Sequence, residues 1–188
     1  MTIALLFTGH MTDLPGRAEP RFPDSLTDAA RARIGAAIDR RVPDPRGPTD
    51  GLAALGFASA ARGGDILFHE ECRRRGIDTV IVLPFDPEEF VRRSVDGVPG
   101  TDWPGRFRDL WSTTPTGHRH VLGLPVNDEA FALCNARLLD LARQHGRVHL
   151  IALWDGKGGD GPGGTADLVS NIRAGDEPDI IAPRDLQS

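Results

Sequence analysis

Short apolar runs alternate with longer segments of helical periodicity along the chain, and this alternation constrains the fold more than any other feature. The runs at residues 3–7 and 79–84 are too short for ordinary helices and continuous enough for strands buried on both faces. Between them, at residues 25–41, apolar positions recur every three or four residues. Strands separated by helices of this length predict an α/β fold of the Rossmann-like, doubly wound type, in which a mostly parallel sheet carries helices on both faces.

The same patterns predict the remaining elements and one domain. A chain of 188 residues with 39% hydrophobic content suits one sizeable core, so we expect residues 1–188 to form a single domain. The segment 94–120 is long for a connection. Its Trp103, Phe107 and Trp111 share one helical stripe, which indicates a helix docked on the core or, alternatively, a lid that stacks on a base. Further strands are expected at 51–57, 121–122, 148–154 and 179–182, and further helices at 66–75, 127–144 and 163–173.

A stretch of small residues, one cation and two glycines follows the second expected strand. In parallel sheets ligands bind beyond the carboxyl ends of the strands, so this loop is a candidate site. A helix that begins at Gly63 and Gly64 would leave its first amides free for an anion, and Arg62 would add a forked donor suited to phosphate. Asp65 could then accept from ribose hydroxyls. The alternative is a plain turn, with Asp65 as the helix cap and Arg62 in solvent.

A second Gly-rich loop has the same order of strand, loop and helix. It spans residues 155–165, and the amides of Gly163 and Gly164 with the Thr165 hydroxyl could hold phosphate or ribose oxygens. Asp155 and Asp160 could bind hydroxyl groups, although a flexible surface hairpin has a similar composition. No Gly-Lys-Ser/Thr triplet opens the helix, which excludes a Walker A loop.

These two loops resemble motifs of the SLOG superfamily. The sequence SAARGGD, followed by His69 and RRRGIDTVIVLPF, is similar to the Rossmann-like domain of DNA-processing protein A, and GPGGTADL resembles the loop of the Lonely Guy and lysine-decarboxylase-like proteins. The resemblance implies a nucleotide-binding protein and assigns ligand binding to Ser59, Arg62, Gly63, Gly64, Asp65, Gly163, Gly164 and Thr165. Lonely Guy enzymes carry a glutamate three residues after the loop threonine, where this chain has Leu168. Asp167 lies about 100° away on a helix, so the departure puts hydrolysis in doubt while leaving binding intact.

The loop after the first strand should reach the same edge of the sheet. Thr8 and Gly9 could contact the ligand, and Arg17 or Arg21 could close over its charge. The alternative is an irregular, proline-pinned loop with solvated arginines. His10 and His69 are expected to be structural histidines more often than ligands. If an N-glycosidic bond is cleaved, a carboxylate must hold the attacking water, and the candidates are Asp155, Asp65 and Asp13.

Charge and composition limit the kinds of partner that the protein is expected to have. The 27 acidic and 22 basic residues give a net charge of −5, which disfavours nucleic acid as a partner and with it a DNA-handling role. Cys72 and Cys134 have no metal-ligand spacing, so we expect no metal site and no cofactor. The apolar segments are too short to span a membrane and no signal segment stands out, so we expect a cytoplasmic protein without a membrane partner. A homo-oligomer is compatible with the resemblance.

The sequence therefore supports two functional hypotheses. In the first, the protein is a sensor or ligand-binding module for a nucleoside monophosphate or an ADP-ribose-like molecule. In the second, it is an N-glycosidic hydrolase or transferase that acts on a nucleotide. The missing acid at Leu168 favours the first, and the abundance of aspartate in the two Gly-rich loops favours the second.

Overall fold

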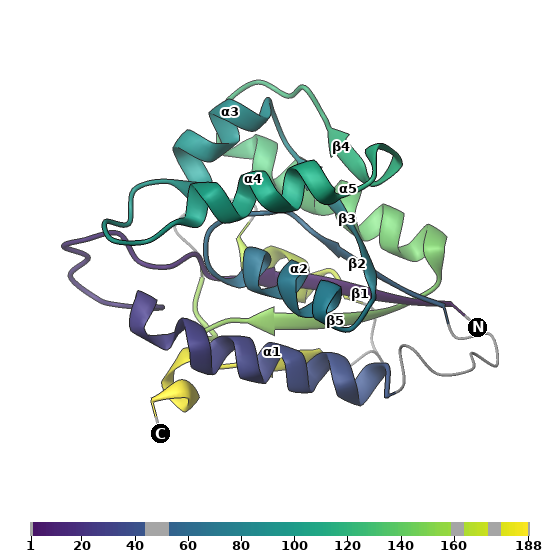
Figure 1. Ribbon diagram of the computed structural model, residues 1–188, viewed down its shortest axis with the longest axis horizontal. Helices are drawn as coiled ribbons and strands as arrows, with labels where there is room; N and C mark the ends of the chain where they lie inside the picture. Colours follow the sequence, from purple (N-terminus) through teal and green to yellow (C-terminus); the bar gives the residue numbers. More distant parts are fainter. Residues whose placement is uncertain (1, 44–52, 159–163, 173–177, 188) are drawn as a thin grey trace.

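One parallel sheet organises the part of the chain that the structure describes. The computed structural model describes residues 2–43, 53–158, 164–172 and 178–187. In that part the sheet has six strands in the order β4-β3-β2-β1-β5-β6, and every pair of neighbours is parallel (Figure 1). The strands are β1 (Thr2–Gly9), β2 (Ala53–Ala58), β3 (Asp78–Leu83), β4 (Arg119–Val121), β5 (Arg147–Leu153) and β6 (Asp179–Ile181).

Helices connect consecutive strands and cover both faces of the sheet. The alternate side chains of β1 show the division, because Ile3, Leu5 and Phe7 belong to one core cluster whereas Ala4 and Leu6 belong to the other. The first cluster includes residues of α1, α2 and α4, and the second includes residues of α5 and α6. The helices are α1 (Thr27–Arg41), α2 (Gly64–Arg74), α3 (Pro87–Phe90), α4 (Trp103–Thr113), α5 (Glu129–His145) and α6 (Thr165–Ser170), and a π-helical turn, Val91–Val95, directly follows α3.

This architecture confirms the predicted fold class. The chain is an α/β protein with a Rossmann-like parallel sheet and helices on both faces. The expected strands all occur within a few residues of their predicted bounds. Residues 51–52 of the second expected strand, and residues 163 and 173 of the last expected helix, lie outside the described residues. The helix expected from residue 66 begins earlier, at Gly64.

The segment 94–120 contains a helix that packs on the core. Trp103 and Phe107 of α4 are buried, and Trp111 is partly buried against the same cluster. The ring of Trp103 carries the Arg106 guanidinium 4.0 Å from its centroid, and its Nε1 donates to Asp24 at 3.3 Å. The aromatic stripe therefore faces the protein interior, as the docking interpretation requires.

The strand order creates a crevice between β1 and β5. From β1 the chain proceeds through α1 to β2 in one direction, whereas from β5 it proceeds through α6 to β6 in the other. Because α1 and α6 also lie on opposite faces of the sheet, the loops after β1 and β5 diverge at the carboxyl edge. Ligands of open α/β sheets bind at such a switch point.

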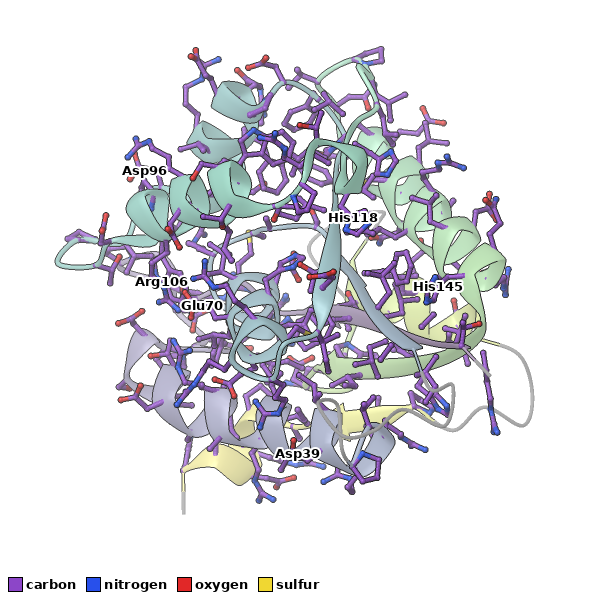
Figure 2. All side chains as sticks on the ribbon, turned by 45° about the vertical axis from the view of Figure 1, so that its right-hand side comes forward. Asp39, Glu70, Asp96, Arg106, His118 and His145 are labelled. Carbon is purple, nitrogen blue, oxygen red and sulfur yellow. The ribbon has the colours of Figure 1, made fainter. Side chains whose placement is uncertain are left out.

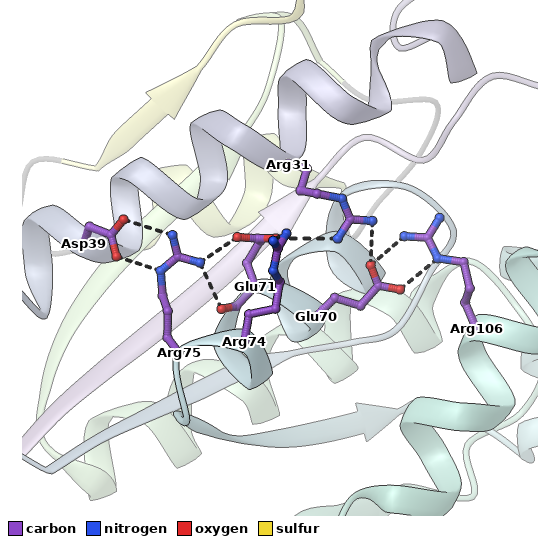
Figure 3. A network of polar contacts seen from close by, with 7 residues as sticks. All are labelled: Arg31, Asp39, Glu70, Glu71, Arg74, Arg75 and Arg106. Atoms are coloured by element: carbon purple, nitrogen blue, oxygen red, sulfur yellow. Dashed lines mark hydrogen bonds and ion pairs between the residues drawn. The ribbon is translucent and has the colours of Figure 1, made fainter. Parts of the chain in front are cut away.

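A network of ion pairs joins α1, α2 and α4 (Figure 3). Glu71 is buried on α2 and pairs with Arg31 of α1, with Arg74 at 3.0 Å and with Arg75 at 2.5 Å. Arg75 also forms a two-pronged contact with Asp39 of α1. A buried carboxylate is stable only while its charge remains paired, so this network fixes how α2 packs against α1.

We predict that Glu71→Ala lowers the free energy of unfolding by about 2 kcal/mol, because it leaves Arg75 and Arg31 without their buried partner. Urea denaturation followed by circular dichroism measures the change. Glu89→Ala is the matched control, since Glu89 pairs with Arg92 and Arg93 at the same helical spacing but on the surface. Equal losses of unfolding free energy in the two variants would show that the burial of Glu71 adds nothing to the stability that its ion pairs provide.

Candidate functional site

A cavity of about 880 Å³ opens at the carboxyl edge of the sheet. Its walls come from the loop after β1, the loop before α2, the π-helical turn, the start of α5 and the segment between β5 and α6. These elements meet at the switch point between β1 and β5. Of the residues predicted from the sequence, the lining includes Thr8, Gly9, Asp13, Arg17, Arg21, Ser59, Arg62, Asp65, Gly164 and Thr165.

Three other predicted residues that the structure describes are absent from that lining. Gly63 and Gly64 lie directly behind it, at the start of α2, and Asp155 follows Trp154, which does line the cavity. Gly163 and Asp160 lie outside the described residues. Their contacts with a ligand stay predictions.

The two glycines at the start of α2 allow the loop after β1 to approach the helix closely. A Cβ on Gly63 would lie 2.7 Å from the Thr12 amide nitrogen and 3.1 Å from the His10 carbonyl oxygen. The Gly64 amide donates to the same His10 carbonyl at 3.2 Å. The expectation that the first amides of this helix are free is therefore wrong for Gly64, because the loop after β1 occupies the position of the expected anion.

Arg62 ties the cavity walls together. Its Nε donates to the Thr12 carbonyl at 2.9 Å, its Nη1 to the Asp96 carbonyl at 3.4 Å and its own amide to the Ser94 carbonyl at 2.9 Å. The side chain is buried and still lines the cavity, so the alternative that places Arg62 in solvent is wrong. One arginine thus holds the loop after β1 and the end of the π-helical turn against the start of α2.

We predict that Arg62→Lys loosens both loops without unfolding the protein, because an ammonium cannot donate in two directions from one rigid fork. Amide hydrogen exchange in residues 10–13 and 94–96 should accelerate by a factor of ten or more. Arg93→Lys is the control, since Arg93 lines the same cavity but pairs with Glu89 on the surface. If the unmodified protein, Arg62→Lys and Arg93→Lys exchange these amides at equal rates, Arg62 does not hold the two loops in place.

Asp65 is a buried acid on the cavity wall. It lies in the first turn of α2, and its Oδ2 accepts the Ala61 amide at 3.2 Å. Burial raises the pKa of its carboxyl to about 7, against the smaller lowering effect of the Ala61 hydrogen bond. A carboxyl with such a pKa is both a proton donor and a proton acceptor near neutral pH, as acid–base catalysis requires.

His69 is a structural residue, as expected. Its Nε2 lies 2.7 Å from the Ser59 carbonyl oxygen, which can only accept, so Nε2 carries the proton and Nδ1 accepts from the Thr79 hydroxyl at 2.8 Å. Burial lowers the pKa of His69 to about 4, which keeps the ring neutral. The imidazole therefore links α2 to β3 and to the loop that carries Ser59.

Asp13 organises the loop after β1. Its Oδ2 accepts the amides of Arg21 and Phe22 at 2.9 and 2.8 Å, and its Oδ1 lies 3.6 Å from Nε of Arg17. These contacts close the loop into a compact turn that presents Arg17 and Arg21 to the cavity. One of the three candidate carboxylates is thus already committed to backbone amides.

His10 and Asp155 connect the loops after β1 and β5. The Asp155 amide donates to Nε2 of His10 at 3.1 Å, and Asp155 Oδ1 lies 3.2 Å from the same nitrogen. Burial lowers the pKa of His10 even though Asp155 opposes the shift. Burial alone would raise the pKa of Asp155, but the Lys157 amide, His10 and Arg21 together hold it below its ordinary value.

The β1 and β5 sides of the cavity also meet through two hydroxyl groups. Thr8, at the end of β1, donates from Oγ1 to Oγ1 of Thr165, which begins α6, at 3.3 Å. Both residues are buried and both line the cavity.

Leu168 lies one turn further into α6 and is buried in the second core cluster. That position on the helix therefore faces the second core cluster and not the cavity.

Two cavity walls were missed in the sequence analysis. One comes from the end of α3 and the π-helical turn, and the other comes from the first two turns of α5. The lining residues at the start of α5 occur at spacings of three and four, as residues on one face of a helix do. This spacing is visible in the sequence but does not indicate a function. The missed polar and aromatic residues are Phe90, Arg93, Ser94, Asp128, Phe131 and Asn135.

A pair of histidines lies away from the cavity. Nδ1 of His118 and Nε2 of His145 are buried without a hydrogen-bond partner among the described residues. In Figure 2 both histidines lie to the right of Asp96, whose carbonyl accepts from Arg62 beside the cavity. Within the described ranges, no group of three or more His, Cys, Asp or Glu side chains could hold a metal ion. None of the helices in that part of the chain has the length and apolar character to cross a membrane.

The fold and the cavity thus define an α/β protein with a Rossmann-like sheet and a small-molecule-sized site at its switch point. No protein-family model and no curated protein matches the chain. A structural similarity links it to the X-ray structure of TM1055, a target of the Northeast Structural Genomics Consortium, with 14% sequence identity and a TM-score of 0.42. The superposition covers 89% of this chain and 66% of TM1055, so this chain spans about two thirds of that protein.

Proposed function

We propose that the protein binds a nucleotide or a nucleotide-derived molecule, such as a nucleoside monophosphate or ADP-ribose, and acts as a sensor or ligand-binding module. The observation that carries the proposal is the cavity of about 880 Å³ at the switch point, with Arg17, Arg21 and Arg62 in its walls. Its volume falls within the range of small-molecule sites, and guanidinium groups suit phosphate oxygens.

The resemblance to the SLOG superfamily supports the same proposal. The two motifs that carry the resemblance are about 100 residues apart in sequence, yet both supply residues to one cavity. Ser59, Arg62 and Asp65 come from the first motif, whereas Gly164 and Thr165 come from the second. Two motifs that bind the same ligand are expected to lie at one site, as these two do.

A module without turnover fits the surroundings of α6. The position at which a Lonely Guy enzyme carries its glutamate is the buried Leu168, and Asp167 receives a hydrogen bond from Asn171 on its own helix.

The second candidate function, an N-glycosidic hydrolase or transferase, rests on Asp65. Its raised pKa, burial and place on the cavity wall suit a general acid or base.

Thermal denaturation with AMP, ADP-ribose, cyclic ADP-ribose, NAD and cyclic dinucleotides tests the proposal. We predict that at least one of them raises the midpoint by several degrees, and that Arg17→Gln weakens its binding about tenfold through loss of a charge-assisted hydrogen bond. Arg184→Gln, at an exposed site near the C-terminus, should bind normally. The absence of any shift across the panel would refute nucleotide binding.

Chromatography of the same mixtures separates the two candidate functions. A sensor leaves the ligand intact, whereas a hydrolase releases the free base, and Asp65→Asn should then abolish that release. We propose that neither nucleic acid nor a membrane is a partner, which filter binding of single- and double-stranded DNA at low salt and vesicle sedimentation can check.

A further inference from the structure

An aromatic wall, formed by Phe90 and Phe131, lines part of the cavity. Phe90 and Phe131 both line the cavity, and Phe85 supports them from behind. The Phe85 ring centroid lies 5.6 Å from that of Phe131, nearly perpendicular to it, and 6.3 Å from that of Phe90. Since Phe85 and Phe90 are buried in the core, the wall is rigid.

The loop after β1 adds two apolar side chains to the same cavity. Met11 is 41% exposed and Leu14 is 48% exposed, and both belong to the lining. A Cβ on Gly97 would lie 2.9 Å from Cδ2 of Leu14, so the loop reaches over to the segment that follows the π-helical turn. Apolar side chains gathered in a cavity are stabilised when a ligand removes them from water.

Polar groups flank the aromatic wall on α5. Asp128, Phe131 and Asn135 occur at spacings of three and four, and all three line the cavity. Asp128 is the residue that precedes α5, but its side chain makes no capping hydrogen bond; the side chain of Asn127 accepts from the Ala130 amide at 3.0 Å instead. The Asp128 carboxylate is exposed at the cavity and is not used to cap the helix.

The lining also carries cationic and hydroxyl-bearing side chains. Arg17 and Arg21 come from the loop after β1, and Thr8 and Thr165 come from the switch point between β1 and β5. The cavity therefore offers a ligand aromatic and apolar side chains together with guanidinium and hydroxyl groups. A ligand that uses both kinds of group needs a planar ring and an anionic, hydroxyl-bearing part.

We propose that Phe131, supported by the buried Phe85 and Phe90, holds the heteroaromatic base of the ligand, that Asp128 accepts a hydrogen bond from an amino group on that base, and that the phosphate lies toward Arg17 and Arg21. This inference rests on the proposed nucleotide binding and adds the position and chemical class of the base. A purine with an exocyclic amino group meets these requirements, because a carboxylate accepts from an amino group and is repelled by a carbonyl oxygen.

Calorimetric titration with matched ligands tests the base position. AMP and ADP-ribose carry the base, and ribose 5-phosphate lacks it. We expect Phe131→Leu to weaken the binding of AMP or ADP-ribose at least tenfold and to leave ribose 5-phosphate within twofold of the unmodified protein. Leu133→Ala is the control, because Leu133 is an exposed side chain of the same helix that does not line the cavity. The far-ultraviolet spectrum and the unfolding midpoint establish that each variant is folded.

The role of Asp128 is tested with AMP and IMP, which differ in the amino group of the base. We expect the unmodified protein to prefer AMP at least tenfold, and Asp128→Asn to remove most of that preference. If Phe131→Leu leaves AMP and ADP-ribose unaffected, or weakens all ligands equally, the base does not bind there, although nucleotide binding survives. If the unmodified protein binds none of the nucleotides, the proposed function fails and this inference fails with it.

Discussion

Gly63→Ala is expected to lower the free energy of unfolding by about 3–5 kcal/mol, because two separate costs fall on one residue. Gly63 has φ of +86° and ψ of −124°, a conformation that residues with a Cβ rarely adopt. The new methyl group would also lie 2.7 Å from the Thr12 amide nitrogen, a backbone atom that cannot rotate away. Chemical denaturation gives the magnitude, and ligand binding should fail as well.

Gly16→Ala isolates the first of these costs. Gly16 has a similar φ of +80°, but no atom lies within 4 Å of its ideal Cβ position. We expect a loss of about 1 kcal/mol for this variant, from backbone strain alone. Equal effects at the two positions would show that the close approach of the loop after β1 to α2 contributes nothing to stability.

Asp65→Asn is expected to stabilise the protein by about 4 kcal/mol above pH 7. In the folded protein burial raises the pKa of Asp65 to about 7, whereas the ordinary value is 3.8. Each unit of difference corresponds to about 1.4 kcal/mol. An asparagine side chain has nearly the same shape, can still accept the Ala61 amide, and carries no charge that burial would penalise.

The pH dependence of this effect follows from proton linkage. Between pH 3.8 and about 7 the folded state keeps the Asp65 proton that the unfolded state has released, so the stability of the unmodified protein falls as the pH rises through this range. The two proteins should be about equally stable near pH 4 and should diverge up to pH 7. Thermal unfolding at a series of pH values measures the difference, and a constant difference across the range would contradict a raised pKa at Asp65.

A stabilising change at a cavity residue has a functional meaning. Proteins retain costly buried charges where function requires them, so Asp65→Asn should lose ligand affinity or turnover while it gains stability. Full activity in the stabilised variant would assign Asp65 to structure alone.

Local patterns predicted the strands because a strand buried on both faces has a distinctive composition. Residues 3–7, 79–84 and 148–154 are mostly apolar runs, and they became β1, β3 and β5, with close agreement in their bounds. The helical stripe through Trp103, Phe107 and Trp111 was also readable, but its burial against the core is decided by the neighbouring helices. The π-helical turn after α3 has no local signature of this kind.

The candidate site was only partly predictable. The sequence indicated the loops after β1, β2 and β5, since parallel strands bring their carboxyl ends to one edge. The prediction that Gly64 leaves its amide free for an anion was wrong. Small residues at the start of a helix suit close contact with a ligand and close contact with another loop equally well. Arg62 illustrates the same ambiguity, since the carbonyls of Thr12 and Asp96 that it binds are about 50 and 34 residues away in the chain.

Apolar periodicity and chain connectivity are local properties, and they were enough to specify the alternation of strands and helices, the parallel sheet and the edge at which a ligand would bind. Which residues share the cavity depends on contacts between distant parts of the chain. Phe90 and Phe131 lie on different elements and meet across Phe85, and Asp65 owes its raised pKa to the side chains that exclude water from it. Contact and desolvation depend on residues far apart in the chain, so no local pattern records them.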